Sequence, residues 1–115
     1  MKKVIYILFT IITFSCITTN AIAVTTRGSP LCSEWVQNQK EKEIKGNTIA
    51  ALDNESWLLG FLSGYALYSD INFIEGTDNK SLFLWVSNYC SANPLKALGT
   101  SGDALFKELK KEKGL

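Results

Sequence analysis

Two cysteines constrain the fold of this 115-residue chain more than any other feature of its sequence. Cys16 lies in an N-terminal segment that is typical of an export signal, so the mature chain keeps only Cys32 and Cys90. In an exported chain a single cysteine pair indicates one disulfide. This bond would close a long loop, to which the chain-entropy model assigns roughly 4 kcal/mol of stabilisation. The alternative, a reactive or metal-binding thiol pair, lacks a C-x-x-C motif.

Residues 1–23 have the three parts of a secretory signal peptide. Two lysines follow the first methionine, residues 4–12 are apolar with one exception, and Ala21-Ile22-Ala23 is a small-x-small cleavage site. The apolar run is too short for a transmembrane anchor, and the residues before Cys16 match a lipoprotein signal poorly. We therefore expect a mature domain of residues 24–115, located in the periplasm or secreted, with no stable membrane span.

The charge balance and the absence of histidine exclude several function classes. Removing Lys2 and Lys3 from the 12 basic residues leaves 10 against 11 acidic ones, a formal charge of −1. No basic patch indicates nucleic acid as a partner. Without histidine a Ser-His-Asp or Cys-His site cannot form, and the commonest zinc ligand is missing. We expect no enzymatic activity, no metal and no cofactor.

Hydrophobic periodicity predicts a small all-α domain, a bundle of about four helices with one disulfide. The first helix is predicted to have Pro30 in its first turn and Ser29 as its cap. Residues 37–45 either extend this helix or form a charged loop. Asp53 or Asn54 is predicted to cap the second helix, because either side chain can accept a hydrogen bond from a free helix N–H.

The third helix is predicted to begin after Asp78 as its cap. Its apolar side chains form one stripe at helical spacing: Leu82, Trp85, Val86, Tyr89 and Cys90. Asn93-Pro94 then predicts the start of a fourth helix, with Leu95 facing the core. Two glycines, at positions 99 and 102, weaken the middle of this helix.

Residues 57–68, which read WLLGFLSGYALY, are the most apolar run outside the N-terminus. Twelve residues between polar flanks are too few to span a bilayer. Five large side chains of this run are candidates either for the core or for a protein-binding stripe: Trp57, Leu58, Phe61, Leu62 and Tyr65. Gly60 and Gly64 are predicted to let another helix pack closely, from the same chain, a second subunit or a client protein.

Three short motifs occur together in this chain. They are C-x-x-W at Cys32, GFLSGY beginning at Gly60, and YCSANP beginning at Tyr89. Their arrangement, over most of residues 31–109, resembles the HdeA/HdeB family of periplasmic acid-stress chaperones. The resemblance implies a small helical protein that is dimeric at neutral pH. In strong acid such proteins dissociate, partly unfold and bind other unfolding proteins, which suppresses their aggregation.

The charged residues permit such a response to acid. Near pH 2 the carboxylates are mostly protonated, because their reference pKa values are about 4. The formal side-chain charge of the mature chain then moves from −1 to about +10, and self-repulsion loosens a small domain. Since the chain contains no histidine, the trigger must lie with carboxylates, below about pH 5.

A second resemblance leads to a different function. Phe61-x-x-Gly64-Tyr65, Val86-x-x-Tyr89 and Asn93-Pro94 are similar to motifs of the Rap/Tai-type immunity proteins of type VI secretion. That resemblance implies an inhibitor that neutralises a toxin delivered into the periplasm. A third interpretation is a non-catalytic envelope protein of unknown role.

Overall fold

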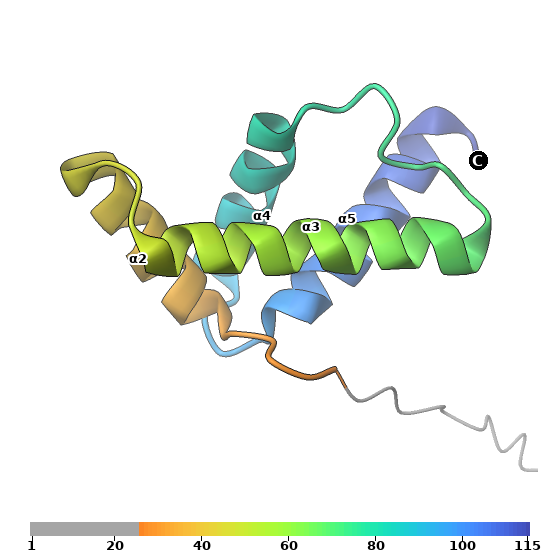
Figure 1. The fold of residues 1–115 in the computed structure, drawn as a ribbon. Coiled ribbons are helices and arrows are strands. Elements are labelled where there is room, and N and C mark those ends of the chain that lie inside the picture. The colour runs from red at the N-terminus through yellow and green to blue at the C-terminus, as the bar shows by residue number, and fades with distance from the viewer. Residues whose placement is uncertain (1–25) are drawn as a thin grey trace, which may run out of the picture.

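The computed structural model describes residues 26–115, which form four helices (Figure 1). They are α2 (Cys32–Lys45), α3 (Ile49–Ser69), α4 (Asn79–Ala92) and α5 (Leu98–Lys113). The predicted all-α fold with about four helices is confirmed. The predicted signal peptide, residues 1–23, lies outside the described residues.

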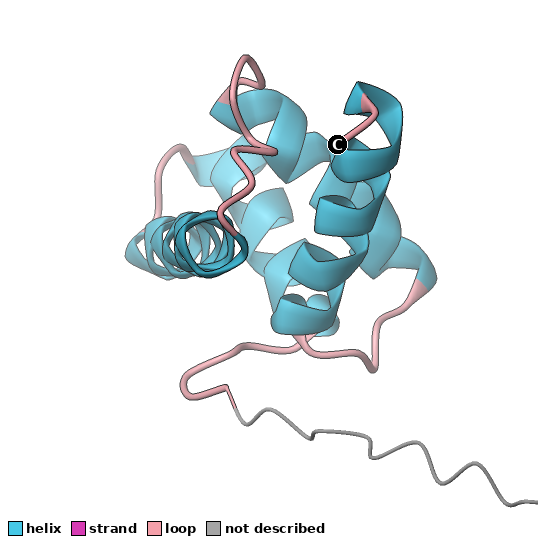
Figure 2. Ribbon diagram, turned by 90° about the vertical axis from the view of Figure 1, so that its right-hand side faces the viewer, coloured by secondary structure: helices cyan, strands magenta, loops and turns pink. Residues whose placement is uncertain are grey.

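Helix α3 is the longest element and lies across the other helices (Figure 1). Seen end-on in Figure 2, it occupies one edge of the molecule, and the other three helices all lie on the same side of it. It packs against α2 and α5. Helix α4 packs against the same two helices. One side of α3 is therefore covered by protein and the opposite side is not.

The core lies between α3 and the other helices. Every helix and the α3–α4 loop contribute fully buried apolar side chains: Trp35, Leu58, Leu62, Phe73, Val86 and Leu98. Trp35 fills the space between α2 and α4, where its ring meets Phe83 edge-on at 5.8 Å. Its Nε1–H donates to Ser87 Oγ at 2.9 Å, so the polar atom of this buried ring has a partner.

The predicted disulfide between Cys32 and Cys90 is confirmed, with the two Cα atoms 4.7 Å apart. Cys32 is the first residue of α2, and Cys90 lies in the last turn of α4. Both residues are fully buried. The bond therefore joins the beginning of α2 to the end of α4 within the core.

The first helix begins two residues later than predicted. Leu31 is the residue before α2 and no side chain caps this helix, so the prediction of Pro30 in its first turn is wrong. Ser29 caps a different helix, because its Oγ accepts a hydrogen bond of 3.1 Å from the N–H of Gly99 at the start of α5. Residues 37–45 extend α2 and do not form a loop.

The second helix begins one turn earlier than predicted. Thr48 is its N-cap, and Thr48 Oγ1 accepts a hydrogen bond of 3.2 Å from the N–H of Ala51. The prediction of a cap at Asp53 or Asn54 is therefore wrong. For α4 the predicted cap is confirmed, since the side chain of Asp78 accepts a hydrogen bond from the N–H of Ser81 at 3.0 Å.

The last helix begins at Leu98 and not at Pro94. Residues 94–97 lie before the helix, and three backbone hydrogen bonds of 2.8–3.0 Å join residues 94–98 to residues 30–33. Leu95, which was predicted to face the core, is exposed. The glycines at 99 and 102 do not interrupt α5, which runs continuously to Lys113.

Candidate protein-binding surface

The five side chains predicted as core or binding stripe lie on the covered side of α3. Leu58 and Leu62 are fully buried. Trp57, Phe61 and Tyr65 are partly buried and pack against the core. In the folded chain these residues therefore form packing contacts and do not form a free surface.

The aromatic side chains of this stripe form the seam between α3 and α5. The rings of Trp57 and Phe61 stack at 5.3 Å, and the ring of Tyr65 lies 4.4 Å from that of Phe106 on α5. Trp57 Nε1–H donates to the backbone oxygen of Arg27 at 3.1 Å, which fixes the residues before α2 against the same seam.

The glycines of α5 pack closely against another helix, and those of α3 do not. A Cβ atom at Gly60 or Gly64 would meet nothing within 4 Å, so the interpretation that these glycines admit a helix of the same chain is wrong. Each glycine follows a buried leucine by two positions, which turns it by about 200° to the opposite side of the helix. In contrast, a Cβ atom at Gly99 would lie 3.4 Å from the ring of Trp57, and one at Gly102 would lie 2.6 Å from the ring of Phe61. That Gly60 and Gly64 admit a helix of a second subunit or of a client protein stays a prediction.

The uncovered side of α3 forms a continuous exposed strip. We call it the α3 outer face and define it by eight exposed residues on one side of the helix: Ile49, Leu52, Asp53, Ser56, Gly60, Ser63, Gly64 and Leu67. Ile49 is 80% exposed and Leu67 is 84% exposed, and Tyr68 beside the strip is 93% exposed. Large apolar side chains thus stand in solvent at both ends of the strip.

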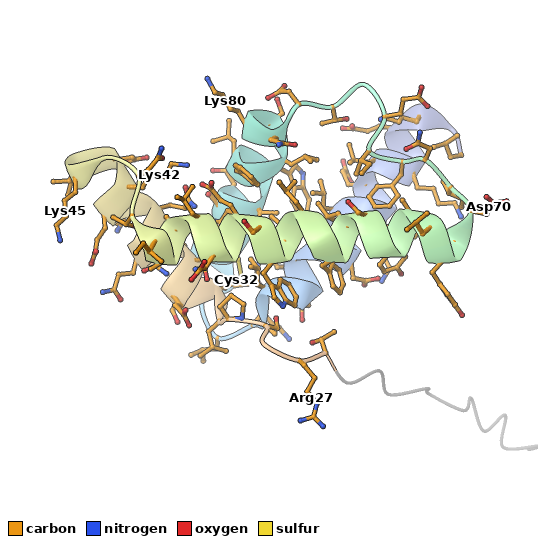
Figure 3. All side chains as sticks on the ribbon, in the orientation of Figure 1. Arg27, Cys32, Lys42, Lys45, Asp70 and Lys80 are labelled. Carbon is orange, nitrogen blue, oxygen red and sulfur yellow. A yellow bond between two sulfur atoms is a disulfide. The ribbon has the colours of Figure 1, made fainter. Side chains whose placement is uncertain are left out.

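Charged side chains are almost absent from this face. Asp53 is its one charged residue, and α3 carries no charge from residue 56 to its end. In Figure 3 the labelled charges of Lys42 and Lys45 lie near the beginning of α3, and Asp70 lies at its other end. The helix therefore presents a nearly uncharged outer face between charged ends.

The other helices do not offer a comparable surface. The outer surfaces of α2 and α5 are rich in lysine and glutamate. On α4, Leu84 is exposed among serine and asparagine residues. The sequence carried a signal for the α3 outer face, because small and apolar residues recur there every three or four positions on the side opposite Leu58 and Leu62.

One end of α3 is attached to α2 through a buried carboxylate. Glu55 Oε1 accepts hydrogen bonds from Lys42 Nζ at 2.6 Å and from Gln39 Nε2 at 3.0 Å. The side chain of Glu55 is 9% exposed, whereas that of Lys42 is 29% exposed. A hydrogen bond between two charged groups contributes more than a neutral one, because their opposite charges strengthen it.

The other end of α3 is attached to α5 through a second carboxylate. Tyr65 O–H donates to Asp103 Oδ1 at 3.0 Å, and Lys107 Nζ donates to Asp103 Oδ2 at 2.7 Å. Burial, followed by the hydrogen bond to Asp103, raises the pKa of the Tyr65 hydroxyl. The same carboxylate raises the pKa of Lys107 through its hydrogen bond. The side-chain hydrogen bonds that join α3 to α2 and to α5 thus each involve a carboxylate.

An open groove of about 520 Å³ lies along α2 and the end of α4. Val36, Ile44 and Pro94 supply apolar parts of its wall, but Lys40 and Glu41 also line it. It contains none of the residues of α3. Its mixed charge makes it a less suitable apolar docking surface than the α3 outer face.

Within residues 26–115, no cluster of three or more cysteine, aspartate and glutamate side chains could hold a metal ion. None of the helices α2 to α5 is both long enough and apolar enough to cross a membrane. Comparisons with protein-family models, with curated proteins and with solved structures find no match for this chain.

Proposed function

We propose that this chain is an exported protein that binds other proteins, and that its binding surface is the α3 outer face. The observation that carries the proposal is the combination of exposed apolar ends with a nearly uncharged surface along a 21-residue helix. Exposed apolar surface bordered by charge is a feature of protein interaction sites. A binding role also suits a chain without histidine, which lacks the commonest catalytic base.

Within this role we propose an acid-stress chaperone that suppresses aggregation. Three features support the proposal. The side chains that attach α3 to α2 and to α5 are those of two acidic residues, Glu55 and Asp103. The formal charge rises to about +10 and favours expansion. The disulfide between Cys32 and Cys90 keeps the loosened chain joined between α2 and α4.

The test is suppression of aggregation by the mature chain, residues 24–115, at about pH 2 to 3 and at pH 7. Leu67→Arg places a charge on the α3 outer face, and Leu84→Arg makes the same change at an exposed site on α4. We expect the unmodified chain and Leu84→Arg to protect an acid-denatured client, and Leu67→Arg to protect it poorly. Equal protection by the two variants would remove the α3 outer face from the proposal. No protection by the unmodified chain in acid would remove the chaperone role.

A second candidate is an inhibitor of one exported toxin. It is favoured by the exposure of Leu67 and Tyr68 in the folded chain, since this end of the surface is accessible without unfolding. Tyrosine is also enriched among residues that dominate interface energies. This candidate requires tight binding at neutral pH to a toxin, for which the product of the neighbouring gene is the first probe. A titration that shows no binding to that protein, or binding unaffected by Tyr68→Ala, would count against it.

A further inference from the structure

We propose that the α3–α4 loop contains a binding site for a primary ammonium group, and that Lys113 of α5 is the occupant supplied by the chain itself. The site consists of three oxygen atoms, the backbone oxygens of Phe73 and Glu75 and the hydroxyl oxygen of Thr77. We call these three atoms the loop cradle. The cradle binds the end of α5, shares no residue with the α3 outer face, and does not require the proposed binding of other proteins.

The three oxygens of the cradle converge on one nitrogen atom. Lys113 Nζ donates to the backbone oxygen of Phe73 at 2.7 Å, to that of Glu75, and to Thr77 Oγ1 at 3.3 Å. A primary ammonium group has three N–H donors and no acceptor, so the cradle offers one acceptor to each donor. A quaternary ammonium ion has the same charge but no N–H donor. The cradle should therefore distinguish these two ions by hydrogen bonding.

The ligands of the cradle are uncharged, which suits a cation of charge +1. In the described part of the chain no carboxylate forms an ion pair with Lys113. The carboxylate of Glu75 accepts a hydrogen bond from Asn72 Nδ2 at 3.1 Å, and that of Asp78 accepts one from Ser81 Oγ at 2.7 Å. Proteins usually hold Ca²⁺ and Mg²⁺ with carboxylates. Backbone oxygens can replace the water around K⁺, so K⁺ is the competitor that a test must include.

Contacts that do not involve Lys113 position the cradle. The ring of Phe73 is fully buried and lies 4.9 Å from the ring of Phe106 on α5. The N–H of Thr77 donates to the backbone oxygen of Ile74 at 3.1 Å. Gly76, between two of the ligands, has a φ of 74°, which glycine adopts without strain. The three oxygens should therefore stay close together when Lys113 is replaced, although the loop then opens more often.

Lys113 can leave the cradle at a small cost in free energy. It is exposed and is the last residue of α5. The ends of helices open more easily than their buried middles. Its side chain contributes nothing to the buried core. An ammonium group of another molecule can therefore bind whenever Lys113 is out of the cradle or has been removed.

The test is a titration of the mature chain carrying Lys113→Ala with ethylammonium chloride, followed by the backbone amide signals in nuclear magnetic resonance. A ligand of three non-hydrogen atoms binds in the millimolar range at best. We expect the signals of residues 72–77 to shift saturably, and tetramethylammonium chloride at equal concentration to leave them in place. The unmodified chain should respond at least tenfold more weakly, because its own Lys113 competes. Lys111→Ala, which removes another exposed lysine of the same helix end, should behave like the unmodified chain.

A second variant and a measurement on the unmodified chain complete the test. Thr77→Val removes one of the three acceptors and should weaken the binding of ethylammonium to the Lys113→Ala chain at least threefold. In the unmodified chain the ammonium protons of Lys113 should exchange with water several times more slowly than those of Lys111. Equal exchange rates would overturn the cradle without recourse to any variant.

Three other results would also overturn the proposal. Equal shifts with ethylammonium and tetramethylammonium would reduce the effect to charge screening. A saturable response to K⁺ and none to ethylammonium would make the cradle a metal-cation site. No saturable response of Lys113→Ala, in a chain whose circular dichroism matches that of the unmodified protein, would leave the loop without a binding site.

Discussion

Because α3 packs on α5, replacing a glycine by alanine should have opposite effects on stability at two positions that look alike in the sequence. Gly64 lies in the middle of α3 and Gly102 lies within α5, and each has helical neighbours on both sides. Alanine is better than glycine in a helix interior by about 0.5–1 kcal/mol, since glycine loses more backbone entropy on folding. Gly64→Ala should therefore raise the free energy of unfolding by this amount, because nothing lies within 4 Å of the new Cβ.

Gly102→Ala introduces the same methyl group against an aromatic ring. Its Cβ would lie 2.6 Å from Cε1 and 2.7 Å from Cδ1 of Phe61, about 1 Å closer than the best separation of two carbon atoms. The ring of Phe61 is stacked on Trp57 and meets Tyr65 on its other side, so it has little freedom to move away. Overpacking of this kind costs about 1–3 kcal/mol, which outweighs or cancels the gain in helix propensity.

The difference between the two variants isolates the packing term, because the propensity gain is common to both. Urea unfolding at pH 7 measures both free energies. With a slope of about 1 kcal/mol per molar urea for a domain of this size, the two midpoints should differ by roughly 1–3 M, with Gly102→Ala the lower. Equal midpoints would mean that Phe61 is not held in the seam, and the description of that seam would be wrong.

Three further predictions concern residues that hold the helices together. Ser29→Ala removes the side-chain cap of α5 and should lower the free energy of unfolding by about 1 kcal/mol, measured by thermal unfolding; an unchanged transition would refute the capping role. Because burial and the bond to Asp103 raise the pKa of Tyr65, its stabilisation is complete below about pH 10 and is lost as the pH rises through the higher folded value. Urea melts at pH 8 and pH 11 should show the unmodified chain losing stability relative to Tyr65→Phe; parallel losses would contradict this. Lys113→Met removes hydrogen bonds to the backbone oxygens of Phe73 and Glu75, so amide exchange should accelerate in residues 71–77 before it does so elsewhere.

The existence of the helices and the disulfide could be predicted because both depend on short-range patterns. Apolar spacing defined the covered side of α4, and a count of cysteines in a chain that was predicted to be exported indicated the bond between Cys32 and Cys90. The cap at Asp78 was also recognisable, since a side chain that accepts from an N–H three residues later needs no distant partner.

The beginnings of the other helices depend on distant parts of the chain. Asn93-Pro94 is a strong local signal for a helix start, but backbone pairing of residues 94–98 with residues 30–33 overrides it. The beginning of α3 was missed for a different reason. Its first turn exposes Ile49 and Leu52 to solvent, so the apolar pattern that marks a core-facing helix begins only later.

The role of each glycine combines a local and a distant effect. That Gly60 and Gly64 face away from Leu58 and Leu62 follows from the helical repeat of 100° per residue. That Gly102 faces Phe61 depends on how α5 crosses α3, which no local pattern contains. Spacing therefore predicts well on which side of its helix a residue lies. It predicts poorly which other element that side contacts.

The hydrogen bond from the N–H of Gly99 to Ser29 joins residues 70 positions apart. During synthesis Ser29 is added long before Gly99. The beginning of α5 follows only after the residues of α2, α3 and α4 have been added. Ser29 thus has no partner on α5 until almost all of the remainder exists. Truncated or stalled chains that end before residue 98 would lack the contacts of α5 with Trp57 and Phe61, even if α2, α3 and α4 had formed. The contact forms only when the beginning of α5 meets the residues before α2.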